Sequence, residues 1–160
     1  MNNVLITGSN GFIGSNILEG ILLNNKVILI LRRIDNKKKF NNKRIKILYF
    51  DNYNQLDKKL KKIKAEIVIH CATHYIKAHK TKDISKFAES NILFGNIILD
   101  NLKNMKTKKF INFSTVWEDY NAIKNKTDIN LIGNKLHKRN FIYVKDVVST
   151  IESHMDSNED

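Results

Sequence analysis

The sequence of 160 residues contains no proline, one cysteine and only six glycines. A single cysteine cannot form a disulfide framework, so a reducing compartment suits the chain, and we expect Cys71 to be a small buried hydrophobic residue. The sequence has no apolar run of about 18 residues and no charged-then-apolar leader, which predicts a soluble, cytoplasmic protein. Its 42% of hydrophobic residues is enough for the core of about one domain.

Arginine is also scarce, and lysine accounts for nearly all of the net charge of +12. Such a charge is typical of nucleic-acid-binding proteins. The lysines are spread among many Asn and Ile residues, with denser groups only at 37–39 and 58–64, and no groove-entering motif or stacking aromatics accompany them. We therefore expect a solvated surface with no nucleic-acid and no membrane partner, although a basic field would attract an anionic nucleotide substrate.

Short apolar runs alternate along the chain with longer stretches of helical periodicity. We expect strands at 4–7, 27–31, 45–50, 67–72 and 110–114, and helices at 12–23, 54–63 and 84–105. In the first helix, the apolar face would consist of Phe12, Ile13, Ile17 and Ile21. The alternation predicts an α/β fold, a Rossmann-like doubly wound parallel sheet with helices on both faces.

Three of the six glycines, Gly8, Gly11 and Gly14, lie between the first expected strand and the first expected helix. Gly8 would let the chain turn at positive φ, Gly11 would leave room for phosphates, and Gly14 would let the helix lie close to the strand. The helix N-terminus would add N–H groups and a partial positive charge. A plain turn is the structural alternative, but the context favours a dinucleotide pyrophosphate held by Gly8, Ser9, Asn10, Gly11, Phe12, Ile13 and Gly14.

The second expected strand ends in Arg32 and Arg33, at the place where a partner for the ribose 2′-hydroxyl is usual. Adjacent arginines suit a 2′-phosphate, which they can bind with charge-assisted, bidentate hydrogen bonds. We therefore expect NAD(P) as the cofactor and slightly favour NADP. The alternative is that both arginines simply face solvent.

Five further patterns follow in order along the chain. They are Asp51 after the third strand, Val-Ile-His-Cys-Ala at 68–72, Asn91 with Gly95, Phe-Ser-Thr at 113–115, and Arg-Asn-Phe-Ile-Tyr-Val-Lys-Asp-Val-Val at 139–148. Together with the glycine loop they resemble the extended short-chain dehydrogenase/reductase family of NAD-dependent epimerases and dehydratases acting on nucleotide sugars. The resemblance implies further cofactor contacts from Asp51, Asn52, Cys71, Ala72, Thr73 and Asn91.

The resemblance also implies hydride transfer at the nicotinamide, with Ser114 and Thr115 at the position of the family's catalytic hydroxyl. The family further uses a Tyr-x-x-x-Lys pair. Tyr120 and Lys124 have this spacing, but such a pair is expected by chance in so lysine-rich a chain, and Tyr120 follows Thr115 closely. We therefore interpret Tyr120 as a loop residue.

In the family, a far longer stretch separates the Ser/Thr strand from the segment that 139–148 resembles. The chain thus resembles an internally deleted and shortened member, with a cofactor domain at 1–117, an irregular connector at 118–134 and a C-terminal remnant at 135–160. In the remnant we expect a strand at 141–144 and a helix from Asp146 to about His154. Most of the substrate lobe would be missing.

Two functions remain open on this basis. The first is a nucleotide-sugar epimerase, dehydratase or reductase acting on CDP- or dTDP-linked sugars, which is compatible with a homodimer. The second is a non-catalytic dinucleotide-binding remnant or partner subunit. A metal site is not expected, because His70, His74 and His79 have only Cys71 as a nearby companion.

Overall fold

The computed structural model describes residues 1–33, 40–113 and 144–156. Within these ranges, parallel strands form one five-stranded sheet in the order β3-β2-β1-β4-β5. The strands are β1 (Asn3–Thr7), β2 (Lys26–Arg32), β3 (Ile45–Phe50), β4 (Ile67–His70) and β5 (Lys109–Asn112). The chain moves outward in one direction from β1 to β3 and in the other from β4 to β5, which confirms the expected doubly wound fold.

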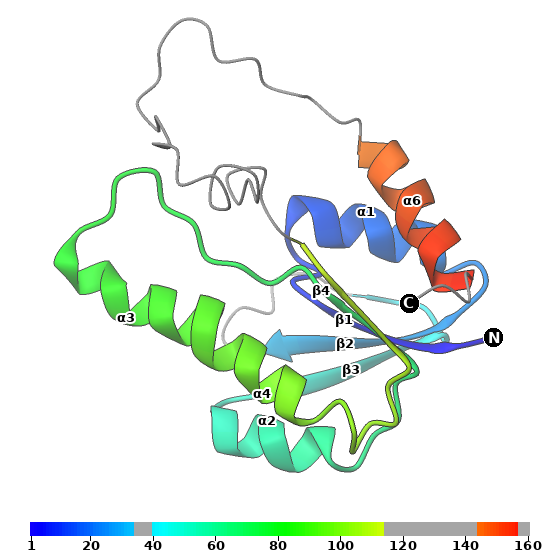
Figure 1. Cartoon of the computed structure of the whole chain (residues 1–160), viewed down its shortest axis with the longest axis horizontal. Coiled ribbons are helices and arrows are strands. Elements are labelled where there is room, and N and C mark those ends of the chain that lie inside the picture. The colour runs from blue at the N-terminus through cyan, green and yellow to red at the C-terminus, as the bar shows by residue number, and fades with distance from the viewer. Residues whose placement is uncertain (34–39, 114–143, 157–160) are drawn as a thin grey trace, which may run out of the picture.

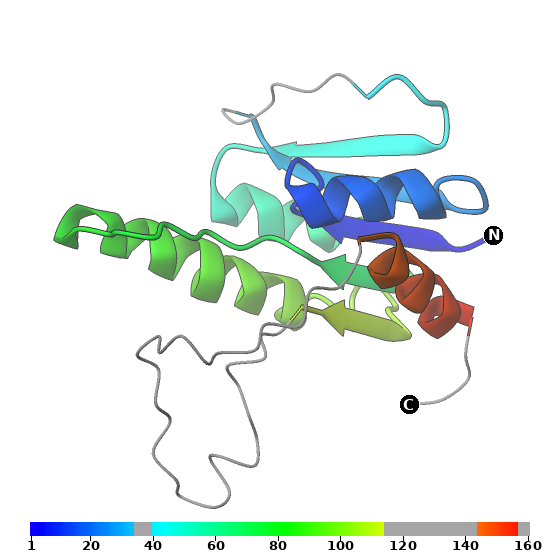
Figure 2. The same ribbon diagram turned by 90° about the horizontal axis from the view of Figure 1, so that it is seen from above.

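Helices cover both faces of this sheet (Figure 1; Figure 2). One face carries α1 (Phe12–Ile21) and α6 (Val144–Asp156), whose buried residues share a hydrophobic cluster with the sheet. The other face carries α2 (Tyr53–Leu60) and a long helical segment. That segment consists of η2 (Thr81–Asp83), α3 (Ile84–Phe87), η3 (Ala88–Leu93) and α4 (Phe94–Asp100).

The central strands separate the core into two layers. Val4 and Ile6 of β1 pack toward α1, whereas Leu5 packs toward α2 and α4, because successive side chains of a strand point to opposite faces. All three are fully buried, and each contributes about 1.5–3 kcal/mol relative to an exposed position. Both faces of β1 and β2 are therefore apolar, as the continuous apolar runs predicted.

The expected apolar face of α1 is wrong at its first turn. Ile17 and Ile21 are buried, but Phe12 is 73% exposed and Ile13 is 39% exposed. Leu18 and Gly14 take the remaining buried positions. The first turn stands at the carboxyl edge of the sheet, where the strands have ended and offer no surface to pack against.

Several other expected boundaries differ from the structure. The helices expected at 12–23 and 54–63 are Phe12–Ile21 and Tyr53–Leu60. The helix expected over 84–105 contains the π-helical η3 and ends its α-helical part at Asp100. The strands expected to end at Ala72 and Ser114 end at His70 and Asn112 among the described residues. The apolar runs predicted which helices and strands form. The residues at which these elements end depend on local hydrogen bonds, which the apolar pattern does not indicate.

The expected strand at 141–144 is contradicted at Val144, which begins α6; residues 141–143 lie outside the described residues. Helical spacing brings Ile151 and Met155 into the core beside α1. Gly20 of α1 allows this approach, because a Cβ there would lie 2.6 Å from Cγ1 of Val148. Tertiary packing on α1 thus overrides the strand preference of the β-branched residues.

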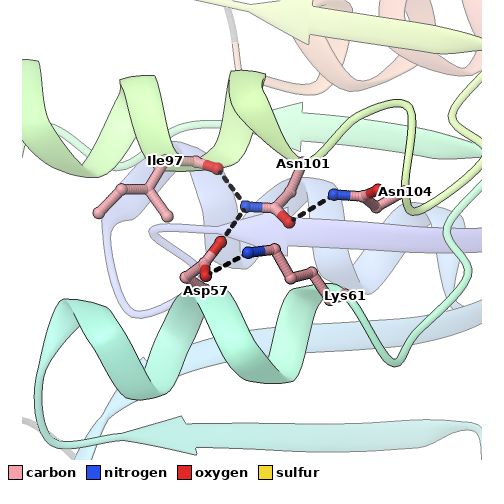
Figure 3. Close-up of polar contacts among 5 residues, drawn as sticks. All are labelled: Asp57, Lys61, Ile97, Asn101 and Asn104. Atoms are coloured by element: carbon pink, nitrogen blue, oxygen red, sulfur yellow. Dashed lines mark hydrogen bonds and ion pairs between the residues drawn. The ribbon is translucent and has the colours of Figure 1, made fainter.

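A polar cluster joins α2 to the end of α4 (Figure 3). Nδ2 of the fully buried Asn101 donates to Oδ1 of Asp57 at 3.0 Å and to the carbonyl oxygen of Ile97 at 3.0 Å. Asp57 also forms an ion pair with Lys61 at 2.7 Å. The hydrogen bonds to Lys61 and Asn101 lower the pKa of the Asp57 carboxyl.

In the part of the chain that the structure describes, no helix has the length and apolar character needed to span a membrane.

Candidate functional site

A cavity of about 370 Å³ opens at the carboxyl edge of the sheet, between the glycine loop, the ends of β2 and β3, and the segment after β4. Figure 2 shows the strands running from the side of the N-terminus toward this edge, where α1 begins. The strand order reverses between β1 and β4, which is where open α/β sheets bind their ligands. The lining residues are Gly8, Asn10, Gly11, Ile30, Leu31, Arg32, Phe50, Tyr53, Cys71, Ala72, Thr73, Ser90 and Phe94.

Two of the three loop glycines are required by the fold itself. Gly8 has φ +72°, and a Cβ there would lie 2.7 Å from the amide nitrogen of Ala72. At Gly14, a Cβ would lie 2.4 Å from the carbonyl oxygen of Gly8. Both approaches are far inside van der Waals contact with backbone atoms, so a larger residue cannot be accommodated without moving the loop.

Gly11 is different, because its absent side chain leaves space at the cavity. A Cβ there would meet only the carbonyl oxygen of Gly8, at 3.3 Å, and Gly11 lines the cavity. Gly11 is also the N-cap of α1, which has no side-chain cap and no acidic residue in its first turn. No acidic residue of the first turn, and none of the described residues lining the cavity, therefore neutralises the positive end of the helix dipole.

The other loop residues divide between the cavity and the protein interior or solvent. Asn10 lines the cavity, whereas Ser9 is fully buried and its hydroxyl has no hydrogen-bond partner among the described residues. Phe12 and Ile13 are exposed and do not line the cavity. The cradle is thus formed mainly by backbone and by the missing side chains of the glycines.

The two adjacent arginines point to different surroundings. Arg32 lines the cavity. Nε of Arg33 instead donates to Oδ1 of Asp51 at 3.1 Å, and its guanidinium lies 5.6 Å from the ring centroid of Tyr49. Arg33 follows the end of β2 and its guanidinium is turned toward Asp51, so of the two arginines only Arg32 lines the cavity.

Asp51 and Asn52, expected near the cofactor, organise the end of β3. Asp51 is paired with Arg33, and Oδ1 of Asn52 caps α2 by accepting from the backbone nitrogen of Gln55 at 2.9 Å. Neither residue lines the cavity. Both sides of the Arg33–Asp51 pair are about half exposed, so the pair adds little to stability.

A buried hydrogen-bond network fixes the segment after β4. Oγ1 of Thr7 accepts from the backbone nitrogen of Ala72 at 3.2 Å and lies 2.8 Å from Nδ1 of His70. Thr7 is fully buried, and burial lowers the pKa of His70. The network holds Ala72 against Gly8. The glycine loop and the segment after β4, which form two walls of the cavity, are therefore held together.

Cys71 lines the cavity, but its thiol is not activated. Burial raises the pKa of Cys71 to about 12, which keeps the sulfur protonated. Cys71 is thus an unreactive thiol as expected, but it is only half-buried at the cavity and not fully buried.

Asn91 holds the next part of the same segment. Its Oδ1 accepts from the backbone nitrogen of His74 at 2.7 Å, and its Nδ2 donates to the carbonyl oxygen of His74 at 2.9 Å. Oγ1 of Thr73 lies 3.4 Å from Oδ1 of Asn91. Asn91 does not line the cavity, and it positions Thr73, which does.

Three aromatic side chains that the sequence patterns did not indicate form one wall of the cavity. Phe50, Tyr53 and Phe94 lie with ring centroids 5.8–6.3 Å apart and all line the cavity. The Tyr53 hydroxyl donates to the carbonyl oxygen of Glu89 at 3.0 Å, and burial raises the pKa of Tyr53. Phe50 and Tyr53 flank Asp51 at the carboxyl end of β3, and this position at the shared edge of a parallel sheet was the available signal.

Within the described ranges, no group of three or more His, Cys, Asp or Glu side chains is arranged to hold a metal ion. The rings of His74 and His79 pack on Phe87, at 5.2 and 5.5 Å between centroids. The expected catalytic residues Ser114, Thr115, Tyr120 and Lys124, and the expected connector at 118–134, lie outside the described residues.

Comparison with known proteins agrees with this geometry. Residues 4–120 match the NAD dependent epimerase/dehydratase family. A dTDP-D-glucose 4,6-dehydratase of Dictyostelium discoideum is 37% identical over 126 residues, covering 72% of this chain and 29% of the relative. The chain thus spans less than a third of the length of this curated relative.

Solved structures show the same fold. The Bordetella bronchiseptica enzyme WbmG in complex with NAD superimposes with a TM-score of 0.61 at 20% identity, over 72% of this chain and 38% of that one. UDP-glucose 4-epimerase of Thermotoga maritima, solved with UDP-glucose, superimposes with a TM-score of 0.57 at 26% identity, over 71% and 38%.

Proposed function

Because the chain belongs to the NAD dependent epimerase/dehydratase family, we propose that its cavity binds NAD(P) with the pyrophosphate against Gly8 and Gly11. The observation that carries the proposal is the difference among the glycines. Gly8 and Gly14 are closed in by backbone, whereas the open side of Gly11 adjoins the cavity at the N-terminus of α1. This is the arrangement that a diphosphate requires.

The remaining lining gives the rest of the cofactor suitable surroundings. Phe50, Tyr53 and Phe94 offer flat apolar surface for a base, and Thr73, positioned by Asn91, lies on the opposite wall near β4. We propose that Asp51, Asn52 and Asn91 do not touch the cofactor themselves. They act indirectly, because their hydrogen bonds hold the residues that form the walls of the cavity. When bound, the nicotinamide supplies the hydride chemistry.

We further propose a preference for NADP that depends on Arg32 alone. Arg33 forms an ion pair with Asp51 and does not line the cavity, whereas Arg32 does. A guanidinium there can bind a 2′-phosphate by charge-assisted hydrogen bonds. Replacing Arg32 with Ala should weaken NADPH binding much more than NADH binding, while Arg33→Ala should affect both slightly. Equal losses for the two coenzymes in Arg32→Ala would contradict the assignment.

For the reaction, we propose a nucleotide-sugar epimerase, dehydratase or reductase with CDP- or dTDP-linked substrates, in line with the dTDP-D-glucose 4,6-dehydratase relative. Thr115 and Ser114 are the proposed hydroxyls that meet the reacting sugar oxygen. The second candidate is binding without turnover, which is favoured by the short distance in sequence between Thr115 and Tyr120. In that case the Tyr120→Phe variant should show almost the same reaction rate as the wild type.

The long helix also supports the family's usual homodimer. Ile92 is 62% exposed and Leu99 is 46% exposed on α4 and its preceding turn, an apolar surface suited to a second copy. Analytical ultracentrifugation should show a dimer that dissociates in an Ile92→Lys variant. A monomeric wild-type protein would contradict this part of the proposal.

The test of cofactor binding is calorimetric titration of the purified chain with NADPH and NADH. Gly11→Val should lower affinity at least about tenfold while circular dichroism stays unchanged, because the new side chain fills the phosphate position. Gly95→Ala is the matched control, since a Cβ there makes only an ordinary 3.6 Å contact with Nε2 of His70. Unchanged affinity in Gly11→Val would refute the assignment. Adding 4-keto sugars linked to CDP or dTDP and following NADPH absorbance then separates the enzyme from the non-catalytic alternative.

A further inference from the structure

The parallel sheet collects basic residues at the edge opposite the dinucleotide cavity. All strands start at this edge, which lies on the side of the N-terminus in Figure 2. Lys26 begins β2, Lys43 and Arg44 precede β3, and Lys62 and Lys64 precede β4. These residues are spread along the sequence, and the fold alone makes them neighbours.

They line a groove of about 480 Å³ at the N-terminal ends of β2, β3 and β4. Lys46 from the second position of β3 completes the set, so that among the described residues lining the groove six are basic and none is acidic. The volume lies within the range of about 300–1,000 Å³ that is typical of small-molecule sites. The groove therefore combines concave shape with one sign of charge.

No carboxylate of the described residues neutralises the lysine ammonium groups of this groove. In the described residues, no ion pair or side-chain hydrogen bond engages Lys26, Lys43, Lys46, Lys62 or Lys64, and all five are exposed. The nearby carboxylate, Glu66, accepts from the backbone nitrogen of Asn3 at 3.3 Å and pairs with Lys108 at 3.2 Å. These two partners lower the pKa of the Glu66 carboxyl. Its negative charge is therefore paired with Lys108 and not with the lysines of the groove.

The side chain of Arg44 is held in place at the groove by hydrogen bonds to the backbone. Its Nη1 donates to the carbonyl oxygen of Leu22 at 3.1 Å and also to that of Leu23, which ties the segment before β3 to the end of α1. The surrounding lysines remain free to turn toward a ligand. Several like charges gathered without counter-charges repel one another, and a bound anion relieves this repulsion.

We propose that this groove is a second anion site, which binds a small ligand carrying several linked phosphates. Lysines are point-charge donors suited to phosphate oxygens. No aromatic side chain is among the described residues that line the groove, so there is none to stack a base and the recognised feature is the run of phosphates itself. The concave shape favours a small oligophosphate over a nucleic-acid strand. The site is independent of the proposed cofactor binding, because the two cavities lie at opposite edges of the sheet and have no described lining residue in common.

Calorimetric titration of the full chain with inorganic tripolyphosphate tests the proposal. Lys46→Gln combined with Lys62→Gln should weaken binding at least about tenfold. The matched control combines Lys82→Gln with Lys86→Gln, which removes the same charge from exposed positions of the long helical segment and should leave affinity within about twofold. Equal losses in both double variants would overturn the site, because they would show attraction to net charge alone.

Two further arms exclude other binding modes. The Gly11→Val variant should keep its tripolyphosphate affinity, since the dinucleotide cavity is at the other edge; loss of binding there would place the anion in the glycine loop and overturn the proposal. A single-stranded oligonucleotide, titrated at matched phosphate concentration, should bind more weakly than tripolyphosphate. Preferential binding of the oligonucleotide would replace the small-ligand proposal with a nucleic-acid surface.

Discussion

The carbonyl oxygen of Gly8 lies 2.4 Å from the position that a Cβ on residue 14 would occupy. The turn after β1 and the first helical turn of α1 are therefore packed backbone against backbone. This contact sets the direction in which α1 leaves the sheet, and it places Gly11 at the mouth of the cavity. Gly8 and Gly14 are thus required by the fold, whereas Gly11 leaves open space beside the cavity.

We predict that Gly14→Ala destabilises the fold much more than Gly11→Ala. The Cβ at residue 14 must displace backbone, which costs about 2 kcal/mol or more, whereas the 3.3 Å contact at residue 11 needs a shift of only a few tenths of an ångström. Urea unfolding followed by circular dichroism gives both free energies of unfolding. Similar values for the two variants would contradict the packing of the loop.

We predict that the stability of the protein falls as pH decreases below about 6.5, through His70. Burial lowers the pKa of His70 below its ordinary value of 6.5. Between the unfolded and folded pKa values only the unfolded chain takes up the proton, so folding loses at most about 1.4 kcal/mol per pH unit there, and stability is retained above this window.

Unfolding free energies measured from pH 8 to pH 5 check this prediction, with His70→Asn as the comparison. The variant should be less stable at pH 8, because Thr7 loses its partner at 2.8 Å, but its stability should depend less on pH. An unchanged pH profile in His70→Asn would assign the effect to another group.

We predict that Cys71 reacts very slowly with a thiol reagent in the folded protein. With its pKa raised to about 12 by burial, only about one thiol in ten thousand is ionised at pH 8, and the thiolate is the reactive form. Ellman's reagent should modify Cys71 quickly only after unfolding in urea. Rapid labelling of the folded chain would show that the wall after β4 opens.

We predict that Asn101→Leu lowers the free energy of unfolding by about 1–3 kcal/mol. The variant removes the buried amide that donates to Asp57 and to the carbonyl oxygen of Ile97, and it leaves both acceptors without this donor (Figure 3). Asn104→Ala is the control, because Asn104 is exposed and only supports Asn101 through one 3.1 Å hydrogen bond. Chemical denaturation of the three proteins decides the matter, and equal stability of wild type and Asn101→Leu would remove the cluster's structural role.

Much of the fold could be read from local patterns. The continuous apolar run at 27–31 became β2, because a strand buried on both faces needs continuous apolar sequence. The stretch at 45–50 became β3 with the expected bounds, although its second residue, Lys46, is exposed at this edge strand. The predicted burial of Phe12 and Ile13 in α1 is wrong, because the periodicity of the sequence does not indicate where the sheet ends beneath the helix. The strand predicted at Val144 is wrong for a related reason, because α6, which begins at this residue, packs on α1.

The amino-acid order by itself determined the alternating elements and the loop of Gly8, Gly11 and Gly14, because backbone freedom and burial act over a few neighbouring residues. Only the tertiary structure decided that Arg32 faces the cavity while Arg33 pairs with Asp51, and that Phe50, Tyr53 and Phe94 form one wall. It also decided that lysines far apart in sequence share one groove. The physical reason is the parallel sheet, which brings all strand beginnings to one edge and all strand ends to the other, so residues distant in the chain become neighbours there.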